Sequence, residues 1–216
     1  AFYRDRLAAL GWAMAGEFGF YTLTKDDKTL TLTILPDEAA ALTVDQIAAM
    51  ATRQISGFET ADLNVMSSDQ IEAFTTGQVA ALTTNQVRNL GTAQISAIES
   101  TDVPALKAAQ LAAMTATQIR SMTTDQVSKL IKPQISTLGT LQLTAFDTTQ
   151  IEAFSTEQLA ALRTQQFKSL TTEQVSALLT EQIIGITKTN LAALTTAQAS
   201  NLTTDQVAAL LTNQIA

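Results

Sequence analysis

Twenty-two positions spaced eight residues apart, from Gln46 to Gln214, carry a polar side chain, and nineteen of them are Gln. The exceptions are Asp62, Asp102 and Asn190. We number each eight-residue repeat, or octad, from this polar position, so that the consensus is Gln-Ile-Ala-Ala-Leu-Thr-Thr-Asp. Positions 2 and 5 are apolar in every octad. Because this register is unbroken over about 170 residues, the sequence indicates a repeat protein.

The octad is incompatible with one long helix or one long strand. Eight residues turn an α-helix by about 800°, so an apolar stripe would drift by about 80° per octad and wind around every face. A strand would need apolar residues at a spacing of two, whereas here the spacing alternates between three and five. The pattern therefore predicts an all-α solenoid with one short helix and one break in each octad. Helices this short need their neighbours for stability.

Hydroxyl residues mark the predicted breaks. Position 7 is Thr or Ser in seventeen of twenty-two octads, and position 6 is Thr or Ser in eleven. Either position suits a helix N-cap, and Thr75–Gln78 also reads as the capping box Thr-x-x-Gln. Pro133 lies just before a Gln, at a helix start where proline is tolerated, and Pro104 is expected to distort its octad.

Three positions of the octad are predicted to face the interior. Positions 2 and 5 supply large apolar side chains, and position 4 is small, with Ala in twelve of twenty-one octads. Small side chains at position 4 would let adjacent coils approach closely. The residues predicted in the core at position 5 include Leu82, Leu130, Leu162, Leu170, Phe58, Phe74, Phe146, Phe154, Met50, Met66, Met114 and Met122.

A longer period of 40 residues overlies the octads. The pairs Ile55-Ser56 and Ile95-Ser96 are one example, and the segment Gln-Ile-Glu-Ala-Phe at 70–74 recurs at 150–154. Two interpretations remain open. Five octads were duplicated as a unit, or five octads match a whole number of superhelical turns.

The Gln column also has two interpretations. It is either a polar stripe that binds a ligand such as a glycan, or a ladder whose amides bond backbone groups at the breaks between helices. A primary amide offers two donors and an acceptor, and its recurrence in every octad suits a repeated architectural need. We therefore predict that Gln118, Gln126 and Gln158 belong to a buried amide ladder.

Residues 1–36 do not follow the octad register. Tyr3, Leu7, Leu10 and Met14 have helical spacing, and two strands are predicted at Phe20–Thr24 and Thr29–Leu35 around the turn Lys25–Lys28. The predicted domains are thus an N-terminal helix-hairpin cap, residues 1–36, and an octad-repeat α-solenoid, residues 37–216. The final segment 214–216 contains no polar cap, so the array is either cut there or meets another surface.

The composition argues against several classes of function. The net charge is −7, with 20 acidic and 13 basic residues, which disfavours nucleic acid, and no apolar run is long enough to insert into a membrane. The chain contains no His and no Cys. We therefore expect no enzyme activity, no catalytic or metal-binding residues and no cofactor. Asp26 and Asp27 could bind a cation, although a hairpin turn explains them better.

Two resemblances follow from the repeat motif. The segment Leu-Thr-Thr-Asp-Gln-Val at 202–207 is similar to the opening of TAL-effector repeats, but those repeats are about 34 residues long, basic and equipped with a base-reading loop that this chain lacks. We attribute that likeness to shared capping chemistry. Residues 43–216 as a whole resemble the Thr-Thr-x-Gln-rich tandem repeats of large exported bacterial surface and adhesin-like proteins. This resemblance implies an extracellular or cell-surface location and a structural or adhesive role, with no catalytic residues to carry over.

The sequence thus predicts a secreted, non-enzymatic structural protein. We expect it to assemble end to end into a bacterial surface structure or filament, with itself as the main partner and other surface proteins or glycans as further partners. The alternative is an adhesin-like binding module that recognises a peptide or glycan on the solenoid surface. Clustered aromatic or charged side chains on the exterior would favour that alternative, whereas the aromatic residues here occupy predicted core positions.

Overall fold

The structure is a computed structural model that describes residues 13–15, 21–25, 28–32, 39–210 and 214. It divides into two compact units, Ala1–Leu90 and Gly91–Ala216, which we describe separately. The predicted boundary between residues 36 and 37 stays a prediction.

Three short strands lie in the N-terminal part of unit 1. They are β1 (Ala13–Ala15), β2 (Tyr21–Lys25) and β3 (Lys28–Leu32), and they form an antiparallel sheet in the order β1-β2-β3. β2 and β3 overlap the two predicted strands, and Leu23 pairs with Leu30. The helical assignment of Met14 is wrong, because Met14 lies in β1 and pairs with Leu23. Residues 1–12 and the pair Asp26-Asp27 lie outside the described residues, and the capping role of residues 1–36 stays a prediction.

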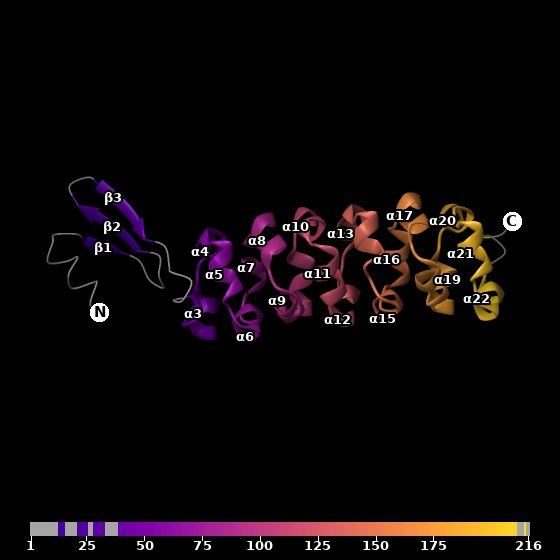
Figure 1. Cartoon of the computed structure of the whole chain (residues 1–216), viewed down its shortest axis with the longest axis horizontal. Coiled ribbons are helices and arrows are strands. Elements are labelled where there is room, and N and C mark those ends of the chain that lie inside the picture. The colour runs from indigo at the N-terminus through magenta and orange to yellow at the C-terminus, as the bar shows by residue number, and fades with distance from the viewer. Residues whose placement is uncertain (1–12, 16–20, 26–27, 33–38, 211–213, 215–216) are drawn as a thin grey trace. The chain divides into compact units, whose positions relative to one another are not determined.

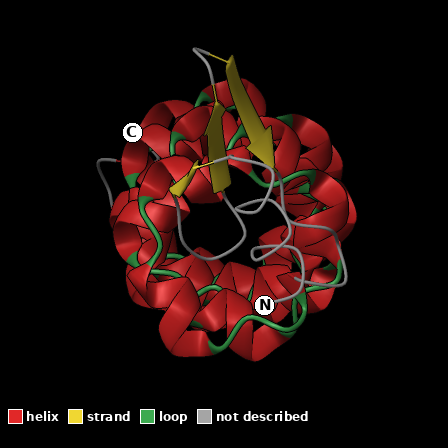
Figure 2. Cartoon of the chain, turned by 90° about the vertical axis from the view of Figure 1, so that its left-hand side faces the viewer, coloured by secondary structure: helices red, strands yellow, loops and turns green. Residues whose placement is uncertain are grey.

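Each octad in the described residues contains one short helix (Figure 1). In unit 1 these are α3 (Val44–Ala49), α4 (Thr52–Gly57), α5 (Thr60–Asn64), α6 (Ser68–Glu72), α7 (Thr76–Ala81) and α8 (Thr84–Asn89). In unit 2 they are α9 (Thr92–Ala97), the 3-10 helix η1 (Ser100–Ala105), α10 (Ala108–Ala113), α11 (Ala116–Ser121), α12 (Thr124–Ser128), α13 (Lys132–Thr137), α14 (Thr140–Leu143), α15 (Thr148–Glu152), α16 (Thr156–Ala160), α17 (Thr164–Lys168), α18 (Thr172–Ser176), α19 (Thr180–Gly185), α20 (Lys188–Ala192), α21 (Thr196–Ser200) and α22 (Thr204–Ala209). Short loops join successive helices (Figure 2). The prediction of a tandem array of short helices is confirmed.

The helix N-cap lies at position 6 of the octad. In α12, Thr123 has an extended backbone conformation and its hydroxyl accepts from the backbone N–H of Gln126 at 3.1 Å. The side chain at position 6 caps the helix in this way in eleven octads. The capping box occurs with both bonds at Thr123–Gln126. At Thr75–Gln78, which the sequence predicted as a capping box, Gln78 Oε1 accepts from the Thr75 N–H at 2.8 Å but the Thr75 side chain makes no cap bond. The Thr at position 7 is the first helical residue rather than a cap. Pro133 is the second residue of α13, and Pro104 lies in η1, the octad that departs from α-helix.

Helices three octads apart pack against each other within each unit. In unit 2, α16 begins at Thr156 and packs on α19, which begins at Thr180 (180 − 156 = 24 residues, or three octads). The Gln182 side chain reaches further back, to carbonyls 28 and 31 residues earlier. One superhelical turn therefore contains between three and four octads. Five octads are not a whole number of turns, so the turn-matching interpretation of the 40-residue period is wrong and duplication remains.

Positions 2 and 5 form the apolar interior of both units. Every residue at these positions from Ile47 to Ile186 is at most 4% exposed, which confirms the predicted core. In unit 2 a void lined by Ile95, Val103, Met114 and neighbouring side chains has no volume that a water molecule could occupy. The edge-to-face contact of the Phe146 and Phe154 rings, with centroids 5.2 Å apart, adds to this packing.

Position 4 differs from its prediction. Most of its small side chains, such as Ala97 and Ala113, are only half-buried, so they flank the core rather than fill it. Ala145, 5% exposed, is an exception. The close approach that small residues permit is nevertheless present in unit 2. A Cβ atom built on Gly185 would lie 2.6 Å from the Cβ of Thr156 on the adjacent coil, so any side chain there would force one of the two coils to shift.

Candidate functional site

The octad glutamine joins two helix ends. In α12, the Oε1 atom of Gln126 accepts from the backbone N–H of the N-cap residue Thr123 at 2.9 Å. Its Nε2 atom donates to the carbonyls of Ile95 and Ile98, at 2.8 and 2.6 Å, on an earlier coil. These two carbonyls belong to positions 2 and 5 of the octad that lies four repeats earlier. One amide thus bonds a backbone N–H at the start of one helix and two carbonyls at the end of another, where backbone groups lack the full set of intrahelical partners.

The same arrangement recurs along both units. The amide nitrogen donates to carbonyls 31 and 28 residues earlier at Gln78, Gln86, Gln126, Gln134, Gln142, Gln150, Gln158, Gln166, Gln174, Gln182, Gln206 and Gln214. We call this series the glutamine ladder. The ladder joins each coil to the previous one through hydrogen bonds between polar groups, whereas the core joins them through apolar contacts.

The ladder side chains are shielded from solvent. Every polar residue of the column from Asp62 to Gln214 is at most 8% exposed. Within the part of the chain that the structure describes, every buried side-chain nitrogen and oxygen has a hydrogen-bond partner. The ladder prediction for Gln118, Gln126 and Gln158 is confirmed as regards burial, and for Gln126 and Gln158 the bonds to earlier carbonyls are as predicted. The interpretation of the column as a ligand-binding stripe is wrong, because its amides are buried and already bonded.

Two exceptions in the column show what a shorter side chain costs. Asn190 donates to one carbonyl, that of Leu162 at 3.0 Å, and the backbone N–H of Thr187 is not held by its oxygen. Asp62 accepts from the backbone N–H of Glu59 at 2.8 Å but has no amide nitrogen to donate. Burial raises the pKa of Asp62, while the hydrogen bond from Glu59 opposes that rise and the Glu59 charge adds to it.

The acidic side chains at position 8 lie in the first turns of their helices and are exposed. Hydrogen bonds from its own backbone N–H and from the hydroxyl of Ser155 lower the pKa of Glu157, as expected for a carboxylate at a helix start. The structure therefore places these acids as solvated helix-start residues. Among the residues 39–210 and the three strands, His, Cys, Asp and Glu form no group of three that could hold a metal ion.

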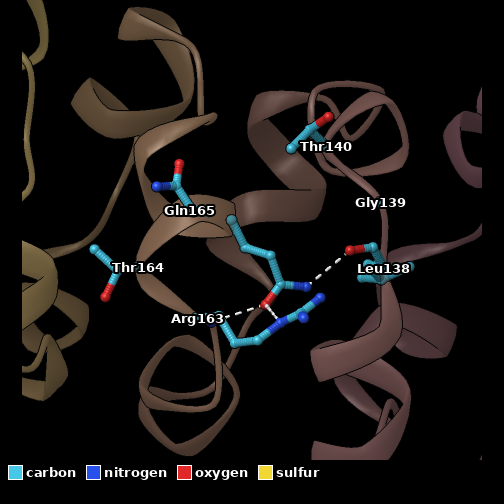
Figure 3. A pocket seen from close by; sticks show the side chains of 7 residues that line it. Leu138, Gly139, Thr140, Arg163, Thr164 and Gln165 are labelled. Carbon is cyan, nitrogen blue, oxygen red and sulfur yellow. Dashed lines mark hydrogen bonds between the residues drawn. The ribbon is translucent and has the colours of Figure 1, made fainter.

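A shallow depression in unit 2 is the candidate binding site on the surface. It has a volume of about 350 Å³ and lies between two coils (Figure 3). The residues that line it are Leu138, Gly139, Thr140, Arg163, Thr164, Gln165 and Gln166. The Arg163 side chain extends along the depression toward Leu138, and its Nε donates to Oε1 of Gln166 at 3.3 Å. The Gln166 amide in turn donates to the Leu138 carbonyl at 2.8 Å.

The depression arises from two exceptions at position 6. Gly139 and Arg163 occupy N-caps three octads apart, where the consensus has Thr. Gly139 contributes no side chain, and Arg163 supplies a cation above the ladder amide of Gln166. Sequence analysis missed this site, because the two exceptions become neighbours only when the number of octads per turn is known. No catalytic, metal-binding or cofactor-binding residue was predicted, and the two core and ladder residues that line this depression, Leu138 and Gln166, are buried.

Comparison with known proteins identifies the repeat type. The family model of the ALTTAQ repeat matches residues 55–92, 95–131 and 156–188, together half of the chain. The hexapeptide Ala-Leu-Thr-Thr-Ala-Gln itself occurs at 193–198. No curated protein matches the sequence. No helix among the described residues is long and apolar enough to cross a membrane.

Proposed function

The chain belongs to the ALTTAQ repeat family, and from that premise we propose that it is a structural repeat protein of a bacterial surface structure or filament. In this proposal it is non-enzymatic, is located outside the cell or at the cell surface, and assembles with itself end to end. The observation that carries the proposal is the glutamine ladder. The buried amides of the glutamine ladder hold one coil to another, so the polar residue that recurs in every octad has an architectural use.

The exterior of the octads supports a structural role. The solvent-facing positions 3, 7 and 8 carry mostly Ala, Ser, Thr and acidic residues, whereas the large aromatic side chains Phe58, Phe74, Phe146 and Phe154 are buried. Binding surfaces are enriched in exposed aromatic and Arg side chains. A net charge of −7 also keeps such a protein soluble before it assembles.

End-to-end assembly would use a head-to-tail contact, in which different surfaces of two identical molecules meet. Such a contact is heterologous and produces a filament unless its rotation closes a ring. In this proposal the N-terminal segment 1–36 takes part in the contact. Deleting residues 1–36 should then abolish assembly and leave the helical content of the octads intact.

The proposal is tested with the full chain. Multi-angle light scattering over a wide range of protein concentrations should show growing particles, and electron micrographs should show filaments. Circular dichroism of the 1–36 deletion should retain the helical signal of the octads. A full chain that stays monomeric at the highest concentration would contradict the assembly function.

The depression at Arg163 favours a second candidate function, a binding module. A guanidinium group in a depression that Thr140 and Thr164 also line suits a carboxylate, as on an acidic peptide or an acidic glycan. Arg163→Ala should weaken such binding at least tenfold in a titration with an acidic oligosaccharide or peptide, whereas Lys132→Ala, which removes an exposed cation from an adjoining helix start, should not. Equal binding by both variants and the parent would exclude this site.

A further inference from the structure

The helices of unit 2 form three rows, because each helix packs on the helix three octads later. One row consists of α9, α11, α14, α17 and α20, and a second consists of η1, α12, α15, α18 and α21. The third row consists of α10, α13, α16, α19 and α22. Every third octad of the sequence therefore belongs to the same row, and the three rows divide the charged side chains of unit 2 unequally.

The first row carries only positive charges. Its octads span residues 91–98, 115–122, 139–146, 163–170 and 187–194, and they contain no Asp and no Glu. Their four basic side chains are all exposed and give the row a charge of +4: Arg120, Arg163, Lys168 and Lys188. We call this row the cationic row. The depression beside Arg163, between α14 and α17, lies on it (Figure 3).

The second row is acidic. Its octads span residues 99–106, 123–130, 147–154, 171–178 and 195–202. Lys129 is their one basic residue, and five of their acidic side chains are exposed, which leaves an exposed charge of −4: Glu99, Asp125, Asp147, Glu152 and Glu173. A sixth acid, Asp102, is buried at a ladder position. We call this row the acidic row. The third row, with two bases and three acids, is nearly neutral.

Charges of one sign follow each other on adjacent coils in both rows. The Asn190 side chain donates to the Leu162 carbonyl at 3.0 Å. Arg163 comes directly after Leu162, and Lys188 lies two residues before Asn190, so the two cations belong to neighbouring helix starts. On the acidic row, exposed carboxylates occur on the adjacent helices α12, α15 and α18 or at their N-caps. Because both rows belong to the same stack of coils, their opposite charges recur at the same coil spacing.

The two rows already attract each other at one place within the molecule. The hydrogen bond from the Gln150 backbone N–H has the largest effect in lowering the pKa of Asp147, and the charge of Arg120 lowers it further. Arg120 thus lies where the cationic row adjoins the acidic row. Arg163, Lys168 and Lys188 have no carboxylate in their own row that could neutralise them.

A second copy of this chain fits the cationic row better than an unrelated polyanion does. The chain has a net charge of −7, and the other two rows of unit 2 are negative in sum, so a long polyanion is repelled by most of the molecule. A second copy instead brings an acidic row whose charges have the coil spacing of the cationic row. Complementary charges of this kind fix the register in which two surfaces meet.

We infer that the cationic row of one molecule binds the acidic row of a second copy side by side. Carboxylates of the acidic row lie against Arg163, Lys168 and Lys188, and one of them occupies the depression beside Arg163. Every molecule has both rows, so the contact repeats from one molecule to the next. This lateral contact goes beyond the end-to-end assembly proposed above, because it uses the side of unit 2, and it joins filaments into bundles.

The test reverses charges on one row at a time in the full chain. Arg163→Glu combined with Lys188→Glu removes the charge of the cationic row. Lys107→Glu combined with Lys132→Glu is the matched control, because it makes the same charge change at the same octad positions, 6 and 7, on exposed side chains of the third row. At low salt, sedimentation should show a dissociation constant for association at least tenfold above the parent for the first pair and within threefold for the control.

Salt provides an independent measurement on the parent chain. The Debye length is about 30 Å at 0.01 M salt and about 3 Å at 1 M salt, so the row-to-row attraction is screened at the higher concentration. The dissociation constant of the parent should rise at least tenfold between these conditions.

A variant of the acidic row separates loss of the contact from damage to the fold. Glu152→Lys combined with Glu173→Lys should also weaken self-association at least tenfold, while the helical circular dichroism stays that of the parent. Mixing this variant with Arg163→Glu/Lys188→Glu should give heterodimers with the dissociation constant of the parent, because each variant retains one intact row. A mixture that forms no heterodimers would overturn the inferred contact, as would equal weakening by the Lys107/Lys132 pair.

Electron micrographs distinguish this inference from end-to-end assembly. At low salt the parent should form bundles, and Arg163→Glu/Lys188→Glu should form single filaments. Single filaments of the parent at low salt would overturn the lateral contact and leave end-to-end assembly standing. Salt-dependent dimers without filaments would support the lateral contact and contradict end-to-end assembly. A parent that is monomeric at low salt would overturn both.

Discussion

At the level of single residues, glutamine is the side chain that meets all the demands of the ladder position. Its oxygen accepts from the N-cap of its own helix, and its nitrogen has two N–H groups for two carbonyls of an earlier coil. Glutamate would place a carboxylate against those carbonyls and has no N–H to donate. Asparagine is one methylene shorter, and at Asn190 it makes only one of the two carbonyl bonds. The column tolerates these exceptions singly because neighbouring rungs remain intact.

Removing one rung should destabilise the fold. Gln166→Leu leaves the Arg163 N–H and the carbonyls of Ile135 and Leu138 without their buried partner. The expected loss in unfolding free energy is about 1–3 kcal/mol. Gln165→Leu is the matched control, because Gln165 is the exposed neighbour in the same helix and should change stability by less than about 0.5 kcal/mol. Urea denaturation measures the unfolding free energy of both variants. Equal losses in the two variants would contradict a stabilising role of the ladder amide.

The buried carboxyl of Asp62 should make stability depend on pH. Its pKa is raised in the folded chain, mainly by burial. A raised pKa means that the protonated form favours folding, so this contribution is present below the unfolded value and is lost as the pH rises through the folded pKa. Asp62→Asn keeps an oxygen that can accept from Glu59 and removes the charge. The variant should melt higher than the parent at pH 7, and the difference should shrink or vanish at pH 3.

The exposed carboxyl of Asp69 provides the control for this experiment. Asp69 lies in the first turn of α6, where a negative charge favours the helix. Asp69→Asn should therefore not raise the melting temperature at pH 7. If Asp62→Asn also fails to raise it, the buried charge is not a cost to the fold.

At the level of helices, the break between octads allows coils to stack closely. Each helix has at most six residues and would not be stable alone, so its stability comes from the helices three octads before and after it. Position 4 flanks the core and lies where adjacent coils meet. Its side-chain size therefore sets the local distance between coils, as the contact between Gly185 and Thr156 shows.

Adding one methyl group at the closest of these contacts should be destabilising. In Gly185→Ala the new Cβ would lie 2.6 Å from the Cβ of Thr156 and 3.1 Å from its Cα, so backbone must move. We expect a net loss of about 1–3 kcal/mol, despite the better helix propensity of alanine. In Gly77→Ala the nearest atom is Thr52 Cγ2 at 3.6 Å, an ordinary contact, and this variant should be neutral or more stable. Thermal denaturation of both variants and the parent tests this prediction. A Gly185→Ala variant that melts at a higher temperature than the parent would refute the close contact between Gly185 and Thr156.

At the level of the whole molecule, the ladder and the core both connect a coil only to its neighbours in the array. Stability in such a protein is approximately a sum over repeats and their interfaces. Damage to one coil should therefore remain local. The Asn190 octad, with its incomplete rung, is a natural place for such local opening.

Truncation of a core side chain tests this locality. Leu143→Ala removes a side chain that is 0% exposed and should cost about 2–5 kcal/mol. Amide hydrogen exchange should rise mainly in α14 and in its neighbours α11 and α17, and remain close to the parent in distant octads of the same unit. Leu141→Ala in the same helix is the control, because Leu141 is 80% exposed and its loss should leave exchange unchanged. Uniform acceleration across the whole unit would contradict a nearest-neighbour array.

Sequence alone determined the features that depend on local spacing. One helix per octad follows from the mismatch between eight residues and the helical period, and the capping box follows from Thr and Gln three residues apart. The burial of Leu82 or Phe146 follows from an apolar register without exceptions. The ladder itself was predictable because an amide that recurs in every octad needs a recurrent backbone partner.

Only the tertiary structure showed the features that depend on the number of octads per superhelical turn. The octad does not encode the number of repeats per turn, so the carbonyls that Gln126 meets, the neighbours Gly139 and Arg163, and the partial exposure of position 4 were not predictable. The same reason explains Met14, whose helical spacing is local but whose pairing with Leu23 in the sheet is not. Local propensities and spacing determine the helix within each repeat. The packing of one superhelical turn on the next depends on contacts between side chains that are distant in the sequence.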